Sequence, residues 1–498
     1  MTSISAKEDG VTDDVLVVGL ARNADKKLII QSGAIKLDEK ELLEALNDLG
    51  ATGAYDEVTK LPGSATKLLV FTGLGQSDKS GNFSHERLRR AAGAAARQLF
   101  GQESATFAIT HKDDAGFSAI AEGALLGSYA FFEFKGKSSD KDRKEPLKRI
   151  VIHSKVTKSS KAKNLLSRAD VIARHTALVR DLINTPPSHL TPETFSQRFK
   201  KLTASSKASI EILNDAQLKK FGYGGTIAVG QGSASKPRLV HISYSPKKAK
   251  SRIAFVGKGI TFDTGGLALK PAQGMEAMKS DMSGAAAVCA AVLAIAEMGL
   301  NVAVDAWAPL AENMVSDTAT RPSDIIKIYG GKTVEVLNPD AEGRLILADG
   351  LVRAAEFGKK AGGLDAIIDV ATLTGAQSVA LGTRTSAVMT NNEQWRERFM
   401  KVCEETGEAF WPMPLPEELR ASLDSPVADI ANIGDRMGGM LVAGLFLKEF
   451  VDDQLPWLHL DIAGPAFNTG KPHGYTPVGG TGVALRTLVA FAQECSGK

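Results

Sequence analysis

The sequence predicts a two-domain α/β protein, with a smaller N-terminal α/β domain and a larger C-terminal α/β domain that has a central mixed sheet. At 498 residues the chain is too long for one ordinary hydrophobic core. Short apolar runs alternate with helical stretches in both halves, a pattern typical of α/β domains. A helical stretch over 164–182 ends at Asn-Thr-Pro-Pro, which stops a helix. We therefore expect domains at 1–160 and 186–498, joined by a connecting helix over 161–185.

The N-terminal half begins with an apolar strand after an acidic lead. Further strands are predicted where apolar runs end near glycine or charged residues. Together with the first, the predicted strands are 15–20, 28–30, 67–73, 106–110 and 149–153. Leucines spaced on one side of a helix, or runs of alanine, predict helices at 39–49, 85–99 and 115–130. This alternation favours a mainly parallel sheet.

The C-terminal half repeats the alternation with longer apolar runs. The predicted strands are 226–229, 239–244, 253–256, 301–310, 333–337, 366–370 and 457–462. The predicted helices are 194–202, 215–221, 283–298, 346–357, 393–406, 440–451 and 481–493. Helices between strands again indicate a sheet that is covered by helices.

The composition is that of an ordinary globular protein, with 43% hydrophobic and 23% charged residues. A net charge of +3 does not call for nucleic acid or acidic membranes as partners. The three cysteines, Cys289, Cys403 and Cys495, are widely spaced and fit a reducing compartment. The polar first 14 residues lack the apolar core of a signal peptide, and no apolar run reaches about 20 residues. We therefore expect a cytoplasmic protein without membrane contact.

The residues with the most chemistry follow the buried strand 253–256, where glycines free the backbone for a tight loop. They are Lys258, Asp263, Lys270 and Asp281, and later Asp340, Glu342 and Arg344. Carboxylates are hard oxygen ligands for Zn²⁺, Mn²⁺ or Mg²⁺. Taken alone, each acid is more often a surface residue or a helix cap, and Asp281 stands where it could cap helix 283–298. Together, among glycines behind apolar strands, they predict a carboxylate-bridged pair of divalent cations.

Two of these acids, Asp340 and Glu342, are two residues apart. An extended backbone would point both side chains in the same direction. They follow the predicted strand 333–337, and the ends of strands are common ligand sites in open α/β sheets.

The basic residues of the same stretches have possible roles at such a site. Lys258 lies between two glycines and could ligate a cation as a neutral amine, because burial and the field of the cation both push its proton off. Lys270 could stay protonated and stabilise an oxyanion. Arg344 could hold a small anion with two parallel hydrogen bonds. Taken singly, Lys270 and Arg344 are more often members of a surface salt bridge.

Motifs of several other chemistries are missing. The stretch around Lys258 does not match the phosphate-binding pattern Gly-x-x-x-x-Gly-Lys-Ser/Thr. No Gly-x-Ser-x-Gly elbow stands beside the strands, and none of the eight histidines belongs to a His-Glu-x-x-His motif. His459, on an apolar strand, is typical of a hydrogen-bonded core histidine rather than a metal ligand.

Several long motifs resemble the cytosolic leucyl aminopeptidase family, whose members are di-metal aminopeptidases. The motifs are VGKGITFDTGG at 256–266, Lys270, MKSDM at 278–282 and NPDAEGRL at 338–345, with DVATLTG at 369–375 and HLDIAG at 459–464 in support. The resemblance covers roughly residues 180–490, and motifs of this length are highly specific. The family usually has Thr where Pro339 stands and often Ser where Thr264 stands. Pro339 stiffens the loop and deletes one N–H donor behind Asp340.

The resemblance implies two divalent cations per subunit, Mn²⁺ or Zn²⁺, with Mg²⁺ and Co²⁺ as further options. Asp263 and Glu342 would bridge the two cations. Lys258 and Asp281 would complete the ligands of one cation, and Asp340 those of the other through its side chain and its backbone carbonyl.

The resemblance also implies roles for four residues that are not ligands. Lys270 would stabilise the tetrahedral intermediate. Arg344 would bind a bicarbonate ion that acts as general base, helped by backbone near Leu373. Met278 would line the pocket for the first side chain of the substrate, and Leu373 would also contact the substrate. The expected assembly is a homohexamer with D3 symmetry.

The function that the resemblance implies is removal of N-terminal residues from peptides in intracellular peptide turnover, with leucine and other apolar residues preferred. A water or hydroxide that bridges the cations would attack the peptide carbonyl. An alkaline optimum is expected, because the substrate amine must be neutral to bind a cation. The alternative is a DNA-binding regulatory or recombination accessory protein on the same fold, motivated by the lysine runs 155–163 and 247–250. Nucleic acid is disfavoured because no aromatic residues interleave with the lysines of 155–163.

Overall fold

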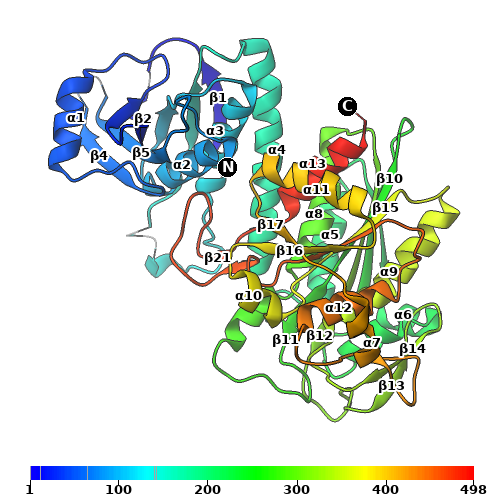
Figure 1. The fold of residues 1–498 in the computed structure, drawn as a ribbon. Coiled ribbons are helices and arrows are strands. Elements are labelled where there is room, and N and C mark those ends of the chain that lie inside the picture. Colours follow the sequence, from blue (N-terminus) through cyan, green and yellow to red (C-terminus); the bar gives the residue numbers. More distant parts are fainter. Residues whose placement is uncertain (1, 12, 64–65, 140, 142, 498) are drawn as a thin grey trace. The chain divides into compact units, whose positions relative to one another are not determined.

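The structure is a computed structural model that describes residues 2–497 apart from 12, 64–65, 140 and 142. It divides into two compact units, the first formed by Met1–Ala177 with Thr469–Val478 and the second by Leu178–Asn468 with Gly479–Lys498. Both units contain a sheet and helices (Figure 1), which confirms the predicted two-domain α/β class. The chain passes from the first unit to the second within helix α4 (Ser159–Asn184).

The sheet of the first unit has the strand order β1-β7-β6-β2-β5-β4 within the described residues, with β3 paired to β2. Its strands are β1 (Ser3–Lys7), β2 (Val15–Arg22), β3 (Leu28–Gln31), β4 (Val58–Pro62), β5 (Leu68–Gln76), β6 (Ser104–Phe107) and β7 (Arg149–His153). All pairs from β1 to β5 along this order are parallel, whereas β3 and β4 are antiparallel to their neighbours. The sheet is therefore mainly parallel, as predicted.

Helices α1 (Glu39–Asp48), α2 (His85–Gln98) and α3 (Asp114–Gly127) accompany this sheet, with a short 3-10 turn η1 (Lys137–Ser139). Helices α2 and α3 pack so closely that a Cβ added at Gly123 would lie 2.0 Å from the Arg89 carbonyl oxygen. The segment Thr469–Val478 is held to the same unit, because the Gly474 amide donates to Asp56 and Arg97 donates to the Gly474 carbonyl. A piece of chain from far along the sequence therefore completes the N-terminal unit.

The main sheet of the second unit has the order β17-β16-β19-β15-β10-β12-β9-β8 in the described chain, with β11 paired to β12. Its strands are β8 (Ser209–Leu213), β9 (Arg238–Tyr244), β10 (Arg252–Gly257), β11 (Gly259–Asp263), β12 (Ala303–Asn313), β15 (Ala366–Ala371), β16 (Ser386–Thr390), β17 (Phe410–Pro412) and β19 (Trp457–Asp461). The pairs β10–β12, β10–β15 and β15–β19 are parallel, and β9–β12 and β16–β19 are antiparallel. The predicted central mixed sheet is confirmed.

Helices surround this sheet (Figure 1). They are α5 (Pro192–Thr203), α6 (Asp215–Phe221), α7 (Gly224–Gly230), α8 (Ser283–Met298), α9 (Gly343–Lys360), α10 (Gly375–Leu381), α11 (Glu393–Thr406), α12 (Gly439–Lys448) and α13 (Leu485–Cys495). Ala254 and Val256 of β10 share a core cluster with Leu347 and Leu351 of α9. A stretch that includes α8, Met275–Met298, is long and apolar enough to cross a membrane by composition alone, but 89% of its apolar window is buried inside the protein.

Two smaller sheets complete the second unit among the described residues. Strands β13 (Asp324–Lys327), β14 (Thr333–Val336) and β18 (Ile430–Ala431) form one, and β20 (Phe467–Asn468) with β21 (Gly479–Gly480) the other. The short 3-10 segments η2 (Met275–Ser280) and η3 (Glu417–Leu423) also lie here. Strand β14 leads directly into the acidic motif that follows it in the sequence.

The strand predicted at 226–229 is wrong, because these residues lie in helix α7. The buried Asp349 carboxylate accepts hydrogen bonds from the Thr226 amide and hydroxyl, which anchors the first turn of the helix. A Cβ at Gly224 would lie 1.9 Å from the Lys327 carbonyl oxygen, and one at Gly225 would lie 2.2 Å from the Leu345 carbonyl oxygen. The apolar run is thus a short buried helix, a case that periodicity cannot distinguish from a strand.

Candidate metal centre

Lys258 stands at the junction of β10 and β11, at the end of the sheet where parallel strands finish. Its amide donates to the Val370 carbonyl of β15, and its carbonyl accepts from the Ala285 amide of α8. Gly257 and Gly284 make this approach possible, since a Cβ at Gly284 would lie 2.0 Å from the Val370 carbonyl oxygen. The side chain is 3% exposed. The backbone of Lys258 is therefore fixed by both a neighbouring strand and a helix.

Asp263 ends β11 and is 2% exposed. Its Oδ1 accepts hydrogen bonds from the Gly265 amide at 2.8 Å and from Asn313 Nδ2 at 2.8 Å. Gly265 has a φ of +86°, a conformation that favours glycine and allows the chain to turn back over the carboxylate. These bonds fix one oxygen of Asp263 and leave the other to contact Lys270.

Asp281 precedes α8, but its side chain does not cap that helix. The residue at the N-cap position is Met282, and it makes no side-chain cap bond. The Asp281 Oδ1 instead accepts from the Thr372 hydroxyl at 2.6 Å, and its Oδ2 is buried without a hydrogen-bond partner among the described residues. The cap interpretation is therefore wrong, and a buried carboxylate oxygen remains available for a cation.

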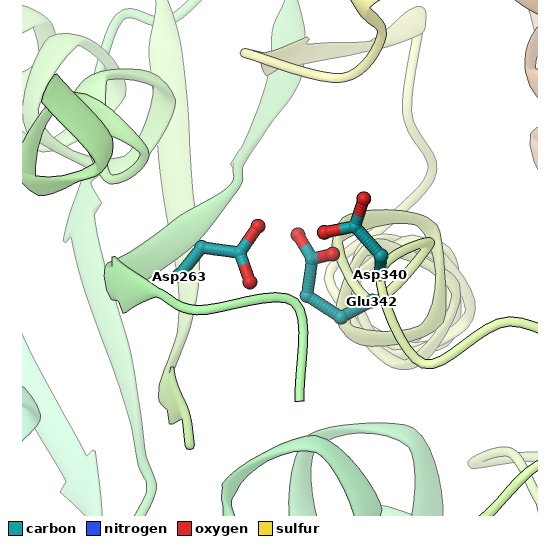
Figure 2. A group of neighbouring side chains, drawn as sticks. All are labelled: Asp263, Asp340 and Glu342. Carbon is teal, nitrogen blue, oxygen red and sulfur yellow. The ribbon is translucent and has the colours of Figure 1, made fainter. Parts of the chain in front are cut away.

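Asp340 and Glu342 come together through a turn rather than through an extended strand. The Ala341 amide donates to the Asn338 carbonyl, and Glu342 has helical angles of φ −77° and ψ −35° at the start of α9. The prediction of an extended backbone is thus wrong, although both carboxylates still reach the same place. One carboxylate oxygen from each of Asp263, Asp340 and Glu342 lies within 4.8 Å of the others (Figure 2).

The two lysines lie between these acids as counter-charges. Lys258 Nζ is 2.8 Å from Asp281 Oδ1, 2.9 Å from Glu342 Oε1 and 2.8 Å from the Thr372 carbonyl oxygen. Lys270 Nζ is 2.8 Å from Asp263 Oδ2 and also contacts Asp340 Oδ1. All five predicted ligands and Lys270 therefore form one connected cluster.

Burial and mutual charge shift the pKa values of this cluster. Desolvation raises the pKa of Asp281 to about 6 and that of Glu342 to about 8, and the negative charge of Asp263 adds to both shifts. Burial also raises the pKa of Asp340. Burial alone would lower the pKa of Lys258 and of Lys270, but the surrounding carboxylates raise both. The protein without cations therefore holds protons on groups that a cation would need.

The residues present fit a pair of divalent cations. Carboxylate oxygens of Asp263, Asp340 and Glu342 lie within 4.8 Å of one another, and Asp281 Oδ2 is a buried acceptor without a partner among the described residues. A Cβ at Gly343 would lie 2.5 Å from Lys258 Cε, so only glycine there leaves the lysine room to reach Glu342. Hard oxygen donors with one nitrogen donor suit Zn²⁺, Mn²⁺, Mg²⁺ and Co²⁺ alike.

The other three predicted site residues lie at or near this cluster. Arg344, in the first turn of α9, is 7% exposed, and its Nη1 donates to the Asn432 carbonyl at 2.7 Å. Its Nε is buried without a partner in the described part of the chain, and burial lowers its pKa to about 10. Met278 in η2 is half-buried, and its carbonyl accepts from the Asp281 amide. Leu373 is half-buried, and its amide donates to Asp461.

Four polar residues that hold the ligand loops were not predicted in that role. Asn432 accepts from the Leu337 and Asn338 amides and donates to the Asn338 carbonyl, which ties down the turn before Asp340. Thr372 holds both Lys258 and Asp281. The other two are Asn313 and Asp461. Thr372 and Asp461 lie inside motifs that the sequence already marks, whereas Asn313 and Asn432 carry no local signal.

Pro339 does not leave the loop behind Asp340 without hydrogen bonds. The Asp340 amide donates to Asn338 Oδ1 at 2.9 Å, and the Pro339 carbonyl accepts from Asn313 at 3.1 Å. The donor deleted by the proline is therefore compensated by asparagines on both sides.

His459 is a core histidine, as predicted. It is fully buried in β19, with Nδ1 2.5 Å from Asp369 Oδ1, and Asp369 also accepts from the indole of Trp457. Burial lowers the pKa of His459, but the Asp369 carboxylate outweighs this effect and raises it.

The lysine run 155–163 is partly neutralised by acids. Lys155 pairs with Asp9 at 3.0 Å, and Lys161 contacts Asp114. Lysines held in this way are less available to phosphate groups, so the run gives the nucleic-acid alternative no support.

Comparisons with known proteins agree with this geometry. The family model described as "Cytosol aminopeptidase family, catalytic domain" matches residues 177–489, and the model of the N-terminal domain of the same family matches 13–138. A protein of Streptomyces avermitilis named "Probable cytosol aminopeptidase" is 50% identical and covers 99% of this chain and 98% of its own length. A Rhodococcus opacus protein of the same name is 47% identical over 97% of this chain and 94% of its own length. The solved structure titled "Bottromycin maturation enzyme BotP in complex with Mn" is 34% identical, with a TM-score of 0.85 over 97% of this chain and 100% of that one.

Proposed function

This chain belongs to the cytosol aminopeptidase family, and from that premise we propose that it removes N-terminal residues, leucine and other apolar ones above all, from peptides. Family membership supports a metal-dependent peptidase. We propose that Lys258, Asp263, Asp281, Asp340 and Glu342 hold two divalent cations, with Asp263 and Glu342 between them. We also propose that the protein is cytoplasmic, in line with the names of the relatives, and that it assembles as a homohexamer.

One observation supports the assignment more than any other. Side chains that stand up to 84 residues apart, from Lys258 to Glu342, lie in one cluster at the ends of β10, β11 and β14. An isolated buried acid would be neutralised or paired with a single base, and here four acids face two lysines. Such a concentration of buried charge costs stability unless cations bind there.

The chain's own residues would carry out the remaining steps of the reaction. Bound cations would polarise the peptide carbonyl and lower the pKa of water, which is the chemistry that this donor set is suited to support. The ammonium of Lys270 would donate a hydrogen bond to the oxyanion that develops on the carbonyl oxygen. The half-buried side chain of Met278 would contact the first side chain of the substrate and favour apolar ones.

Arg344 would hold a bicarbonate ion that accepts the proton of the attacking water. Its buried Nε without a partner among the described residues supports an anion at this place. The Leu373 amide is already directed to Asp461, so this amide positions the 372–374 loop rather than donating to the anion. The anion would therefore depend mainly on the guanidinium.

Chelation is expected to remove most of the peptidase activity, and Mn²⁺ or Zn²⁺ should restore it. The reason is that bound cations polarise the peptide carbonyl and lower the pKa of water, and chelation removes both effects. The measurement is hydrolysis of leucine-p-nitroanilide together with metal content, before chelation, after chelation and after re-addition. Full activity at a metal content near zero would contradict the proposal.

Metal binding is expected to release protons and to tighten as the pH rises from about 6 to about 8. The raised pKa values of Asp281, about 6, and Glu342, about 8, and the raised pKa of Lys258 mean that these groups hold protons a cation must displace. The same raised pKa values affect the stability of the metal-free protein. At low pH the protonated carboxyl groups stabilise its folded state, and this stabilisation is lost as the pH rises through their pKa values in the folded state.

Titration calorimetry at pH 7 in two buffers of different ionisation enthalpy measures this release. On the order of one proton or more per bound pair of cations is expected. Equal heats in both buffers, combined with an affinity that does not change between pH 6 and pH 8, would show that the carboxylates are already ionised. The alkaline optimum expected for activity has the same sign, because the substrate amine must also lose a proton.

A further inference from the structure

We propose that Asn313 is a positioning residue that sets the spacing between Asp263 and Asp340, an inference that rests on the proposed metal-dependent function. Asn313 is the last residue of β12 and is 4% exposed. It stands outside all of the motifs that resemble the family. Its role follows only from what its side chain and backbone contact.

The Asn313 amide group joins two loops that otherwise belong to different sheets. Its Nδ2 donates to Asp263 Oδ1 at 2.8 Å and to the Pro339 carbonyl oxygen at 3.1 Å. Asp263 ends a strand of the main sheet, and Pro339 follows β14 of the three-stranded sheet. Both hydrogens of one NH₂ group are used, one for each loop. One side-chain amide thus bonds both loops and limits the distance between them.

The backbone of Asn313 holds the first loop a second time. Its carbonyl oxygen accepts from the Thr264 amide at 3.0 Å and from the Thr264 hydroxyl at 2.9 Å. Gly266 then passes so close that a Cβ there would lie 2.8 Å from Asn313 Oδ1. The residue is therefore enclosed by the loop that it positions, and its rotamer cannot change without moving that loop.

Lys270 also joins Asp263 to Asp340, but it cannot replace Asn313 when cations are bound. Its link consists of an ammonium that contacts two carboxylates. A bound cation would need the same two carboxylates and would displace the ammonium. The bonds of Asn313 are neutral on its side, and they use a different oxygen of Asp263 from the one that Lys270 contacts. Asp263 Oδ1 accepts from the Gly265 amide and from Asn313, so Oδ2 can face a cation while both bonds to Oδ1 remain. Asn313 is the link that would persist in the loaded protein.

The proposal predicts that Asn313→Ala weakens the binding of at least one Mn²⁺ by about 10- to 100-fold, the range found when hydrogen-bond partners of metal ligands are removed. Asn313→Asp should also weaken it, because it keeps the shape but loses both donors and places acceptor oxygens against Asp263 Oδ1 and the Pro339 carbonyl. The matched control is Asn391→Ala. Asn391 also links two groups through its side-chain amide, the Leu455 carbonyl and the Trp457 amide, but at the start of β19, the opposite end of the sheet.

The experiment is calorimetric titration of metal-free full-length protein with Mn²⁺, with metal content after dialysis and a thermal melt for each variant. Weakened Mn²⁺ binding in both Asn313 variants, with binding unchanged in a folded Asn391→Ala, would support the proposal. Wild-type affinity in a folded Asn313→Ala or Asn313→Asp would overturn it and leave the proposed function intact. Absence of Mn²⁺ binding to the wild-type protein would overturn the proposed function first and this inference with it.

Discussion

Glu342→Gln is expected to lower hydrolysis of leucine-p-nitroanilide by about 10³-fold and to reduce the number of bound cations. The substitution keeps the size of the side chain and removes one negative charge from the centre of the cluster. Glu342 is 2% exposed and contacts Lys258, and one of its oxygens lies within 4.8 Å of Asp263 and Asp340. Loss of a cation removes about 4 kcal/mol of transition-state stabilisation, which corresponds to about 10³-fold in rate.

The control for this variant is Glu408→Gln. Glu408 is also buried, at 8% exposure, and accepts from the amide and hydroxyl of Thr487, away from the cluster. This change should lower thermal stability without altering metal content. If Glu342→Gln keeps two cations and near wild-type turnover while Glu408→Gln behaves as expected, Glu342 is not a ligand.

Lys270→Met is expected to lower the rate by about 10²- to 10³-fold while metal binding stays equal or becomes tighter. The size of the loss is that of removing one donor to a developing oxyanion. The direction of the metal effect follows from the contacts, since the Lys270 ammonium competes with cations for Asp263 and Asp340. The raised pKa of Lys270 keeps that positive charge in place until a cation displaces it.

Rate and affinity must be measured on the same preparation to separate the two effects. Lys332→Met is the matched control, because Lys332 is also partly buried and bound to the Glu449 carboxylate and carbonyl. It should leave both rate and Mn²⁺ affinity unchanged. A Lys270→Met protein that loses its cations would assign Lys270 to metal binding instead of oxyanion stabilisation.

The sequence predicted the strands and helices next to the site well, for physical reasons that can be named. Strand 253–256 is a continuous apolar run between charged and glycine residues, and β10 lies there. The helix predicted at 283–298 coincides with α8, because an unbroken apolar and alanine-rich stretch ends at Gly299 in the left-handed conformation. In both places local preference and burial favour the same structure.

Predictions about side-chain direction failed where tertiary contacts decide it. The N-cap assigned to Asp281 and the extended backbone assigned to Asp340 and Glu342 are both reasonable from neighbours in sequence. In the structure Thr372 and Lys258 orient Asp281, and a turn bonded to Asn432 orients Asp340. Thr372 is 91 residues from Asp281 and Asn432 is 94 residues from Asn338, so no short window along the chain contains the information.

The roles of Asn313 and Asn432 could not be predicted from the sequence either. Asn313 and Asn432 act through amide groups that bond main-chain atoms of distant loops. Neither belongs to a recognisable motif, and asparagine is common in surface turns. The placement of segment Thr469–Val478 could not be predicted for the same reason. Nothing in its amino-acid sequence indicates that it completes the N-terminal unit.

The hydrogen bonds that the Leu373 amide and the Thr374 hydroxyl donate to Asp461 have a consequence for the order of events during synthesis. A ribosome makes this carboxylate 203 residues after Lys258. Until then the loop that contacts Lys258 and Asp281 lacks its bonds to Asp461, and strand β19 is missing from the sheet. A growing polypeptide therefore gains this support for two of the proposed cation ligands only after residue 461 has been made.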